Sequence, residues 1–236
     1  MRAAFEDFFA RLGEVGLDAL VLGAAYDARA PAELRLSSLA PFARSGLLLL
    51  SGGAAFFEAF LRERRDEPDP LDSFTRRTVE ALVAPLSRTG IQLAVRYPFW
   101  NEASPLPFQR IGQAAGLHPS PLGLDLHPRY GPWMAYRALV LVDAALEEQP
   151  VVGFAPCADC EAPCISACPV SAVGRKGWDA ARCFEHRLAG GCADGCHSRL
   201  ACPVGASHRY PLPVLRHFQA SGLDCAAGLE SSKFGA

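Results

Sequence analysis

The distribution of cysteine is the feature that most constrains this chain. All nine cysteines lie between Cys157 and Cys225, and the first 156 residues contain none. The N-terminal residues carry charges among their apolar positions, and the apolar runs fall far short of the ~18 residues that a membrane span needs. We therefore expect a cytoplasmic protein without a membrane segment. Disulfides are rare in a reducing compartment, so cysteines at this density are expected to be metal ligands or redox groups.

Composition supports a folded chain that does not bind nucleic acid. Of the 236 residues, 50% are hydrophobic and 20% charged, which is enough to form a sizeable core. Residues 1–150 carry 15 basic and 18 acidic side chains, a net charge of -3, and residues 151–236 carry 8 and 7, a net charge of +1. Neither part has the excess of basic residues that is typical of a nucleic-acid-binding surface, so we do not expect nucleic acid as a partner.

Apolar periodicity predicts a mixed domain over residues 1–150, followed by a linker at 147–156 and a second domain over 151–236. Helices are expected at residues 3–16, 54–65, 69–90 and 108–116, and strands at 46–51, 91–96, 121–126 and 134–143. Strands interleaved with helices indicate an α/β or α+β fold. A Gly-rich nucleotide fingerprint, a Walker loop and an HExxH zinc motif are absent from the sequence.

The cysteine spacing resembles the ligand pattern of two-cluster bacterial ferredoxins. The first run is Cys157-x2-Cys160-x3-Cys164-x3-Cys168-Pro169, the second is Cys192-x3-Cys196-x5-Cys202-Pro203, and Cys183 lies between them. In those ferredoxins, three closely spaced cysteines bind one 4Fe-4S cluster and the cysteine before proline binds the other. This spacing predicts a small ferredoxin-like domain with two 4Fe-4S clusters.

The crossed pattern assigns eight of the nine cysteines. A cubane needs four thiolates that converge from different directions, so a tight loop supplies three and a remote segment supplies the fourth. We assign one cluster to Cys157, Cys160, Cys164 and Cys202, and the other to Cys168, Cys183, Cys192 and Cys196. A zinc site is the alternative, because paired cysteines also bind zinc. His186 or His197 could replace a cysteine ligand, whereas Cys225 lies outside the pattern as an incidental thiol.

The first domain resembles a family of cobalamin-processing proteins, the cblC type (MMACHC-like). The resemblance rests on residues 124–143, LDLHPRYGPWMAYRALVLVD, which match the His-Pro-Arg-aromatic-Gly-x-Trp segment of that family, and more loosely on the order of elements in residues 32–60. It implies a modified nitroreductase-like fold, related to flavin reductases, that binds cobalamin. The cobalamin-binding residues implied by the match are His127, Pro128, Arg129, Tyr130, Gly131, Trp133 and Tyr136.

The segment at 127–133 has two possible interpretations, a cobalamin pocket and a tight turn. In a cobalamin pocket, Gly131 would allow close approach of the corrin, Trp133 would form an apolar wall, and His127 or Arg129 would bind corrin amides or the nucleotide tail. Residues 97–100 could form another edge of the pocket. As a tight turn, the same segment would place Trp133 in the core and leave Arg129 in solvent.

The cysteine segment resembles that of epoxyqueuosine reductase, which combines a cobalamin-binding domain of the same type with two 4Fe-4S clusters. Cys183, in Asp179-Ala180-Ala181-Arg182-Cys183, matches the lone cysteine between the two runs of that family. Reductive dehalogenases share the design. The acidic catalytic motif of epoxyqueuosine reductase has no counterpart here, and the cysteine segment replaces the arginine-rich glutathione region of the cblC type. We therefore assign no catalytic side chain and expect the clusters to supply electrons.

These resemblances imply an iron–sulfur-dependent cobalamin reductase or processing protein. It would bind cobalamin base-off, reduce the cobalt and remove the upper ligand, with cobalamin as substrate or as permanent cofactor. An external electron donor (a reductase, flavodoxin or ferredoxin) and a cobalamin-accepting protein are the expected partners. The alternatives are a corrinoid-dependent reductase of an organic substrate, as in epoxide deoxygenation or dehalogenation, and a ferredoxin-type electron-transfer protein.

Overall fold

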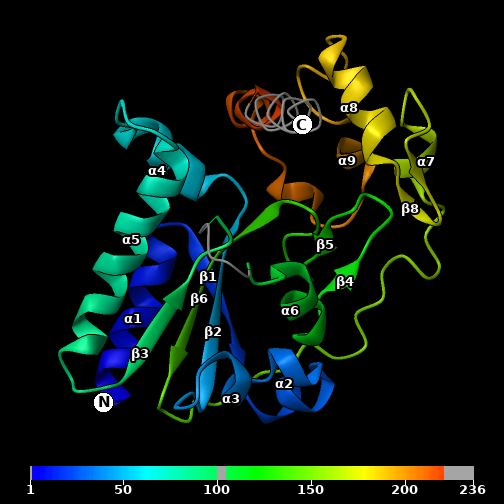
Figure 1. Ribbon diagram of the computed structural model, residues 1–236. Helices are drawn as coiled ribbons and strands as arrows, with labels where there is room; N and C mark the ends of the chain where they lie inside the picture. Colours follow the sequence, from blue (N-terminus) through cyan, green and yellow to red (C-terminus); the bar gives the residue numbers. More distant parts are fainter. Residues whose placement is uncertain (1, 100–104, 221–236) are drawn as a thin grey trace, which may run out of the picture. The chain divides into compact units, whose positions relative to one another are not determined.

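The computed structural model describes residues 2–99 and 105–220, which form two compact units (Figure 1). The sheet unit contains the described residues up to Leu117 together with Met134–Phe154. The cysteine unit contains His118–Trp133 together with the described residues from Ala155 onward. The division expected near residue 150 stays a prediction, and it differs from these units in the placement of residues 118–133.

The sheet unit is built on four antiparallel strands. Their order is β1 (Leu17–Leu22), β2 (Ser45–Gly52), β6 (Met134–Val142) and β3 (Leu93–Arg96). The run of leucines in β2 is buried on both faces: Leu47 and Leu49 belong to one hydrophobic cluster and Leu48 to the other. A strand that is covered on both faces reads as a continuous apolar run, as β2 does.

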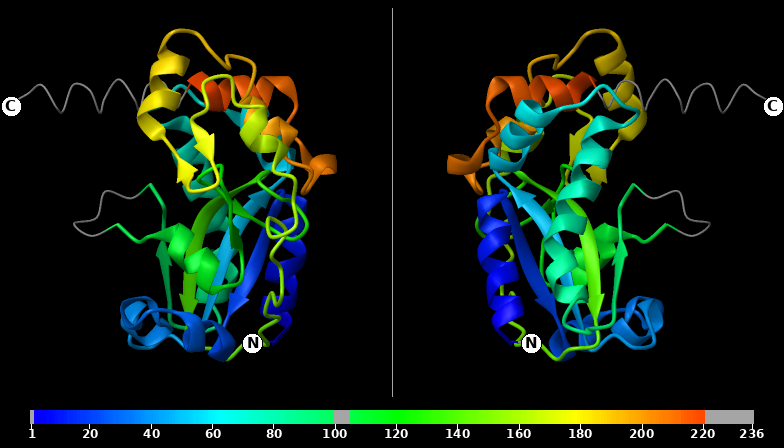
Figure 2. Two further views of the ribbon diagram at one scale, coloured as in Figure 1. Left: turned by 90° about the vertical axis from the view of Figure 1, so that its right-hand side faces the viewer. Right: turned by 90° about the vertical axis from the view of Figure 1, so that its left-hand side faces the viewer.

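Helices cover both faces of this sheet (Figures 1 and 2). On one face lie α1 (Arg2–Glu14), α4 (Ala55–Glu63) and α5 (Pro70–Ser87), which bury phenylalanines against the strands. Buried residues of α2 (Ala24–Arg29), α3 (Leu36–Leu39), the 3-10 turn at Ala32–Leu34 and α6 (Phe108–Ala114) join the other cluster. In α5, Pro70 lies in the first turn, where its missing N–H leaves no helical hydrogen bond unmade, whereas Pro85 lies inside the helix, in its last turn.

The cysteine unit consists of short elements joined by loops. They are two hairpins, β4 (His118–Pro119) with β5 (Asp125–Leu126) and β7 (Val173–Gly174) with β8 (Gly177–Trp178), and the helices α7 (Pro163–Ser166), α8 (Ala180–Leu188) and α9 (His197–Ala201). A 3-10 turn spans Ala206–His208, and residues 212–220 are helical. The side chain of Asp179 caps α8 by accepting a hydrogen bond from the backbone N–H of Arg182 at 3.0 Å.

Most elements expected from periodicity are present, and the short elements α2, α3 and β4 were not expected. The strand expected at 121–126 is reduced to β5, because Pro121 lacks an N–H and Gly123 has a left-handed φ of +70°, so the chain turns there. The strand β1 was not expected: four of its six residues are only half-buried, and Asp18 interrupts its apolar run. Among the described residues, no helix has the length and hydropathy of a membrane span.

We predict that the two faces of β2 contribute separately to stability. Leu48→Ala and Leu49→Ala should each lower the free energy of unfolding by about 2–5 kcal/mol, because each leaves a cavity in a different hydrophobic cluster. Urea denaturation followed by circular dichroism measures the loss. Leu61→Ala on α4 is the control, since Leu61 is 38% exposed and its removal should cost far less. Equal losses at all three positions would contradict the two-cluster core.

Candidate functional site

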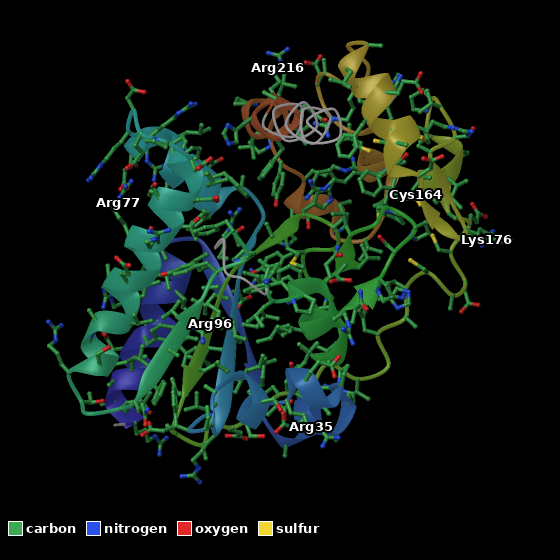
Figure 3. All side chains as sticks on the ribbon, viewed as in Figure 1. Arg35, Arg77, Arg96, Cys164, Lys176 and Arg216 are labelled. Atoms are coloured by element: carbon green, nitrogen blue, oxygen red, sulfur yellow. The ribbon has the colours of Figure 1, made fainter. Side chains whose placement is uncertain are left out.

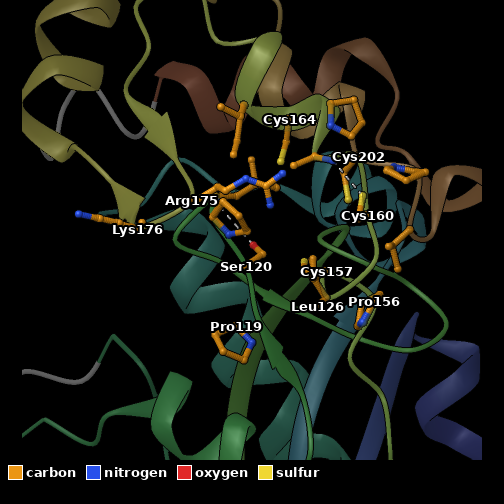
Figure 4. A pocket seen from close by; sticks show the side chains of 18 residues that line it. Pro119, Ser120, Leu126, Pro156, Cys157, Cys160, Cys164, Arg175, Lys176 and Cys202 are labelled. Atoms are coloured by element: carbon orange, nitrogen blue, oxygen red, sulfur yellow. Dashed lines mark hydrogen bonds between the residues drawn. The ribbon is translucent and has the colours of Figure 1, made fainter.

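Four cysteines line a cavity of about 410 Å³ in the cysteine unit (Figure 4). Cys164 lies on α7 and Cys202 ends α9, while Cys157 and Cys160 come from the loop before α7. The helices α7 and α9 contact each other, which brings residues about forty positions apart to one cavity. We call Cys157, Cys160, Cys164 and Cys202 the first cysteine set.

The other four described cysteines line a second cavity, of about 220 Å³. Cys183 lies on α8, Cys196 is the residue before α9, and Cys168 is two residues after the end of α7. Cys192 completes this second cysteine set from the loop between α8 and α9. In Figure 3 the sulfur atoms gather around these short helices, near the labelled Cys164. The structure therefore brings together the same two groups of four that the spacing predicts, although their ligation of iron stays a prediction.

The thiols of each set repel one another when ionised. Burial raises the pKa of the Cys157 thiol, and the other three cysteines of its set raise it further. Burial likewise raises the pKa of Cys183 and Cys192, with added repulsion from Cys196 and Cys168. Four cysteines in so small a space would ionise together only around a positively charged group, and thiolate is a soft ligand that suits iron–sulfur clusters and zinc. Among the described residues, no three His, Cys, Asp or Glu side chains lie close enough together to hold a single metal ion.

Cations, and no carboxylates, accompany the cysteines in the lining of both cavities. Arg175 and Lys176, at the turn of the β7–β8 hairpin, line the first cavity, where Arg175 points inward and Lys176 outward (Figure 4). Arg187 and Arg199 line the second cavity, together with His186 and His197. A lining with this charge stabilises thiolates and any anionic group that they hold.

Backbone amides approach the sulfurs. The N–H of Ala162 donates to Cys160 Sγ at 3.4 Å, and the N–H of Ala172 donates to Cys168 Sγ at 3.2 Å. Burial alone would raise the pKa of Cys168, but N–H groups of residues 170, 172 and 173 and the Ser198 hydroxyl outweigh it, so its pKa is lowered. Hydrogen bonds to sulfur of this kind set the potential of iron–sulfur clusters.

The loops adopt left-handed backbone conformations to make these contacts. Ala162, Ser171 and Cys192 have φ values of 58°, 51° and 55°, in a region that residues other than glycine rarely adopt. Alternating right- and left-handed residues turn successive N–H groups into one concave surface that binds anions. Three of the four non-glycine residues with positive φ in the described part of the chain therefore lie beside the two cysteine sets, and the fourth, Asp69, precedes α5.

The turn expected to bind cobalamin lies in the cysteine unit and is engaged in internal packing. His127 and Gly131 exchange backbone hydrogen bonds of 3.0 and 2.8 Å, and His127 Nδ1 accepts from the N–H of Arg129 at 3.1 Å. The Tyr130 ring stacks on His127 at 4.8 Å and meets His208 at 4.9 Å. Pro128 and Arg129 are exposed, with the guanidinium over the Tyr130 ring.

Gly131 and Trp133 have surroundings that the sequence did not reveal. Gly131 has a φ of +55°, and a Cβ there would lie 2.0 Å from the carbonyl oxygen of Val204. Trp133 is fully buried between Tyr210 and the guanidinium of Arg199, which lies 4.7 Å from its ring and donates to the Pro132 carbonyl. These surroundings match the alternative interpretation of the segment as a turn with a core tryptophan. The cobalamin-binding role of the segment stays a prediction.

Tyr136 belongs to the sheet unit, whereas the other six residues assigned to cobalamin belong to the cysteine unit. It lies on β6 against Phe108, with ring centroids 6.1 Å apart, and its hydroxyl fills the space that a Cβ at Gly112 would occupy. Tyr97 and Phe99 stack at 5.1 Å. Trp100 and Cys225 lie outside the described residues.

Sequence reasoning did not assign the cations and the serine that line the cavities. Arg187 is four residues after Cys183 on α8, and Ser198 is two residues after Cys196 on α9. The i, i+4 spacing on a helix was a usable signal for Arg187. Ser198 carried no comparable signal, because its relation to Cys168 spans thirty residues.

Comparison with solved structures shows what the fold is similar to. A crystal structure of selenomethionine-labelled epoxyqueuosine reductase is 14% identical, with a TM-score of 0.59 over 91% of this chain and 69% of that one. Epoxyqueuosine reductase from Streptococcus thermophilus is 14% identical, with a TM-score of 0.57 over 90% and 68%. The C. elegans B12-trafficking protein CblC, a human MMACHC homologue, is 15% identical, with a TM-score of 0.59 over 93% and 92%.

At these identities the likeness shows a shared mixed α/β fold. The sequence matches no protein-family model and no curated protein.

We predict that Gly131 is required for the cysteine unit to fold, whether or not cobalamin is present. Gly131→Ala should destabilise the cobalamin-free protein, because the new Cβ meets the Val204 backbone and the residue is held at positive φ. Thermal denaturation and iron content measure the effect. Gly190→Ala is the matched control: its φ is +86°, but nothing lies within 4 Å of its Cβ, so it carries the strain without the clash. Similar losses in both variants would contradict the contact.

Proposed function

We propose that this protein is an iron–sulfur-dependent cobalamin reductase or processing protein. The observation that carries the proposal is the division of eight cysteines into two sets of four, each around its own cavity with cations in the lining. The fold supports it, because one structural neighbour is described as a B12-trafficking protein and another as epoxyqueuosine reductase.

The two cysteine sets are proposed to hold two 4Fe-4S clusters. The donor chemistry fits, because each cavity offers four thiolates, lining cations and hydrogen bonds to sulfur. A bound 4Fe-4S cluster supplies one-electron transfer. The chain's own contribution is to hold the thiolates together against their repulsion and to supply N–H groups, O–H groups and cations around them.

Cobalamin is the proposed substrate. It would bind base-off, its cobalt would be reduced at the expense of an external donor, and its upper ligand would leave as cyanide or water. In the turn at 127–133, Arg129 is the residue whose polar group is exposed, held over Tyr130 at 5.1 Å. Its guanidinium is suited to corrin amides or to the phosphate of the nucleotide tail.

A second candidate is a corrinoid-dependent reductase of an organic substrate, with cobalamin as permanent cofactor. The likeness to epoxyqueuosine reductase favours it. A ferredoxin-type electron carrier is the third. Cobalamin that exchanges freely during purification supports processing, cobalamin that is retained supports the permanent cofactor, and failure to bind cobalamin supports the electron carrier.

We predict that iron and acid-labile sulfide analysis of protein purified without oxygen will find about eight of each per chain, as two cubanes require. Cys157→Ser should damage one cluster and Cys183→Ser the other, because the two residues line different cavities. Electron paramagnetic resonance of the reduced variants distinguishes the two losses. A zinc-only protein, or the loss of both clusters in both variants, would refute the crossed ligand sets.

We predict that anaerobically reduced protein will change the visible spectrum of added hydroxocobalamin and cyanocobalamin as the cobalt is reduced. Arg129→Ala should weaken cobalamin binding, measured by the titration midpoint, and leave iron content unchanged, because Arg129 is exposed and lines neither cysteine cavity. The control is Arg182→Ala, an exposed arginine at the start of α8. An unchanged cobalamin spectrum with fully loaded wild-type protein would exclude the reductase.

A further inference from the structure

The second cavity is lined by buried donors that have no nitrogen or oxygen acceptor. Among the described residues, such atoms include Ser198 Oγ, His186 Nε2, Arg187 Nε and Arg199 Nε, and all four residues line the second cavity. None of the residues that line the first cavity has such an atom. Buried donors are costly unless an acceptor satisfies them, so this grouping indicates an occupant of the second cavity that offers hydrogen-bond acceptors.

Ser198 is the best placed of these donors. It lies on α9, only 1% of its surface is exposed, and it lines the second cavity together with Cys168. His186 lies on α8 with its ring against Gly191, next to Cys192, where a Cβ on that glycine would meet His186 Nε2 at 2.1 Å. Both side chains are fixed by packing and line the cavity of the second cysteine set.

The first cavity has a different environment. Its serine, Ser120, uses its hydroxyl to donate to the Leu124 carbonyl at 2.7 Å, so that donor is already satisfied. The hydrogen bonds to sulfur in the first set come from backbone N–H groups, such as that of Ala162. Its lining cations, Arg175 and Lys176, are exposed at a hairpin turn, where water screens their charge.

The arginines of the second cavity are held in place. Arg199 stacks on Trp133 and Tyr210, at 4.7 and 4.8 Å from the ring centroids. Arg187 lies over Phe184 at 5.8 Å and donates to the Gln219 carbonyl at 2.6 Å. A half-buried cation fixed in this way is screened less than an exposed one.

We propose that Ser198 and His186 donate hydrogen bonds to the group held by the second cysteine set and keep its reduction potential above that of the first. This inference rests on the proposed function, in which both sets hold 4Fe-4S clusters. Reduction adds one electron, and so one negative charge, to a cluster. Hydrogen bonds and nearby fixed cations stabilise the reduced form more than the oxidised form, which raises the potential. An added electron therefore resides mainly on the second cluster.

A redox titration of the loaded protein, followed by electron paramagnetic resonance, tests the proposal. The second cluster is identified as the one whose signal Cys183→Ser changes. In the wild type it should be reduced at a higher potential than the first. Ser198→Ala should lower its ratio of reduced to oxidised form several-fold at a fixed applied potential, where a tenfold change corresponds to 59 mV for one electron. The signal of the first cluster should titrate as before.

Two further variants separate hydrogen bonding from packing. Ser198→Thr keeps the hydroxyl and should restore the wild-type potential, and Ser120→Ala, in the first cavity, should leave the second cluster unchanged because its hydroxyl is bonded to Leu124. If Ser198→Ala loses the cluster, His186→Phe tests the same donor array from α8 and should shift the potential downward.

Three outcomes overturn the inference. They are a second cluster that titrates at or below the potential of the first in the wild type, an unchanged potential in Ser198→Ala, and no downward shift in a loaded His186→Phe. With two loaded clusters, any of these leaves the proposed function intact. Absence of iron and sulfide instead contradicts the proposed function itself.

Discussion

The cysteine unit depends on holding four mutually repelling thiols around each of two small cavities. The chain meets this constraint by crossing its two cysteine runs: Cys168 joins the set dominated by the later run, and Cys202 joins the set of the earlier one. Each of these cysteines precedes a proline, which disfavours helix at the preceding residue, and Cys202 is extended with a ψ of 125°. The Cys202 side chain therefore lies beyond the end of α9 and lines the first cavity, with the cysteines of the earlier run. Each set takes one cysteine from the other run, and the contact between α7 and α9 brings the two runs together.

The same constraint explains why residues 118–133 belong with the cysteines. Arg199 lines the second cavity, donates to the Pro132 carbonyl and stacks on Trp133. One guanidinium thus supplies positive charge beside four thiols and anchors a segment nearly seventy residues earlier in the chain. Gly131 makes a second contact between these segments, because only a residue without a Cβ allows the Val204 backbone to approach it. The turn that resembles a cobalamin-binding segment is part of the framework that holds the second run of cysteines.

Sequence patterns that repeat within a few residues predicted individual elements, whereas contacts between distant residues could be identified only in the structure. The stripe of Phe5, Phe8 and Leu12 predicts α1 because it repeats within a few residues. The resemblance of the cysteine spacing to ferredoxins predicts which cysteines share a cavity. The sequence signal for Gly131 and Trp133 was the resemblance alone. Their packing depends on Val204, Arg199 and Tyr210, whose positions no periodicity relates to the turn. The short strand β1 was missed for a similar reason, since its pairing with β2 is what makes LDALVL a strand.

The packing of the turn bears on whether cobalamin is a substrate or a permanent cofactor. Tight retention of a large ligand needs many preorganised side chains that face it. Here His127 accepts hydrogen bonds from its own turn, Trp133 is fully buried, and Gly131 is occupied by the Val204 backbone. These groups already make contacts within the protein, and Arg129 is the one polar side chain of the turn that is exposed. If the turn contacts cobalamin as proposed, so few exposed polar groups would suit a ligand that binds, reacts and leaves, as the proposed processing function requires. The difference between the two cavities is consistent with the same proposal. If both hold clusters, the buried donors of the second cavity would favour reduction there, and electron delivery to a transient acceptor needs such a difference.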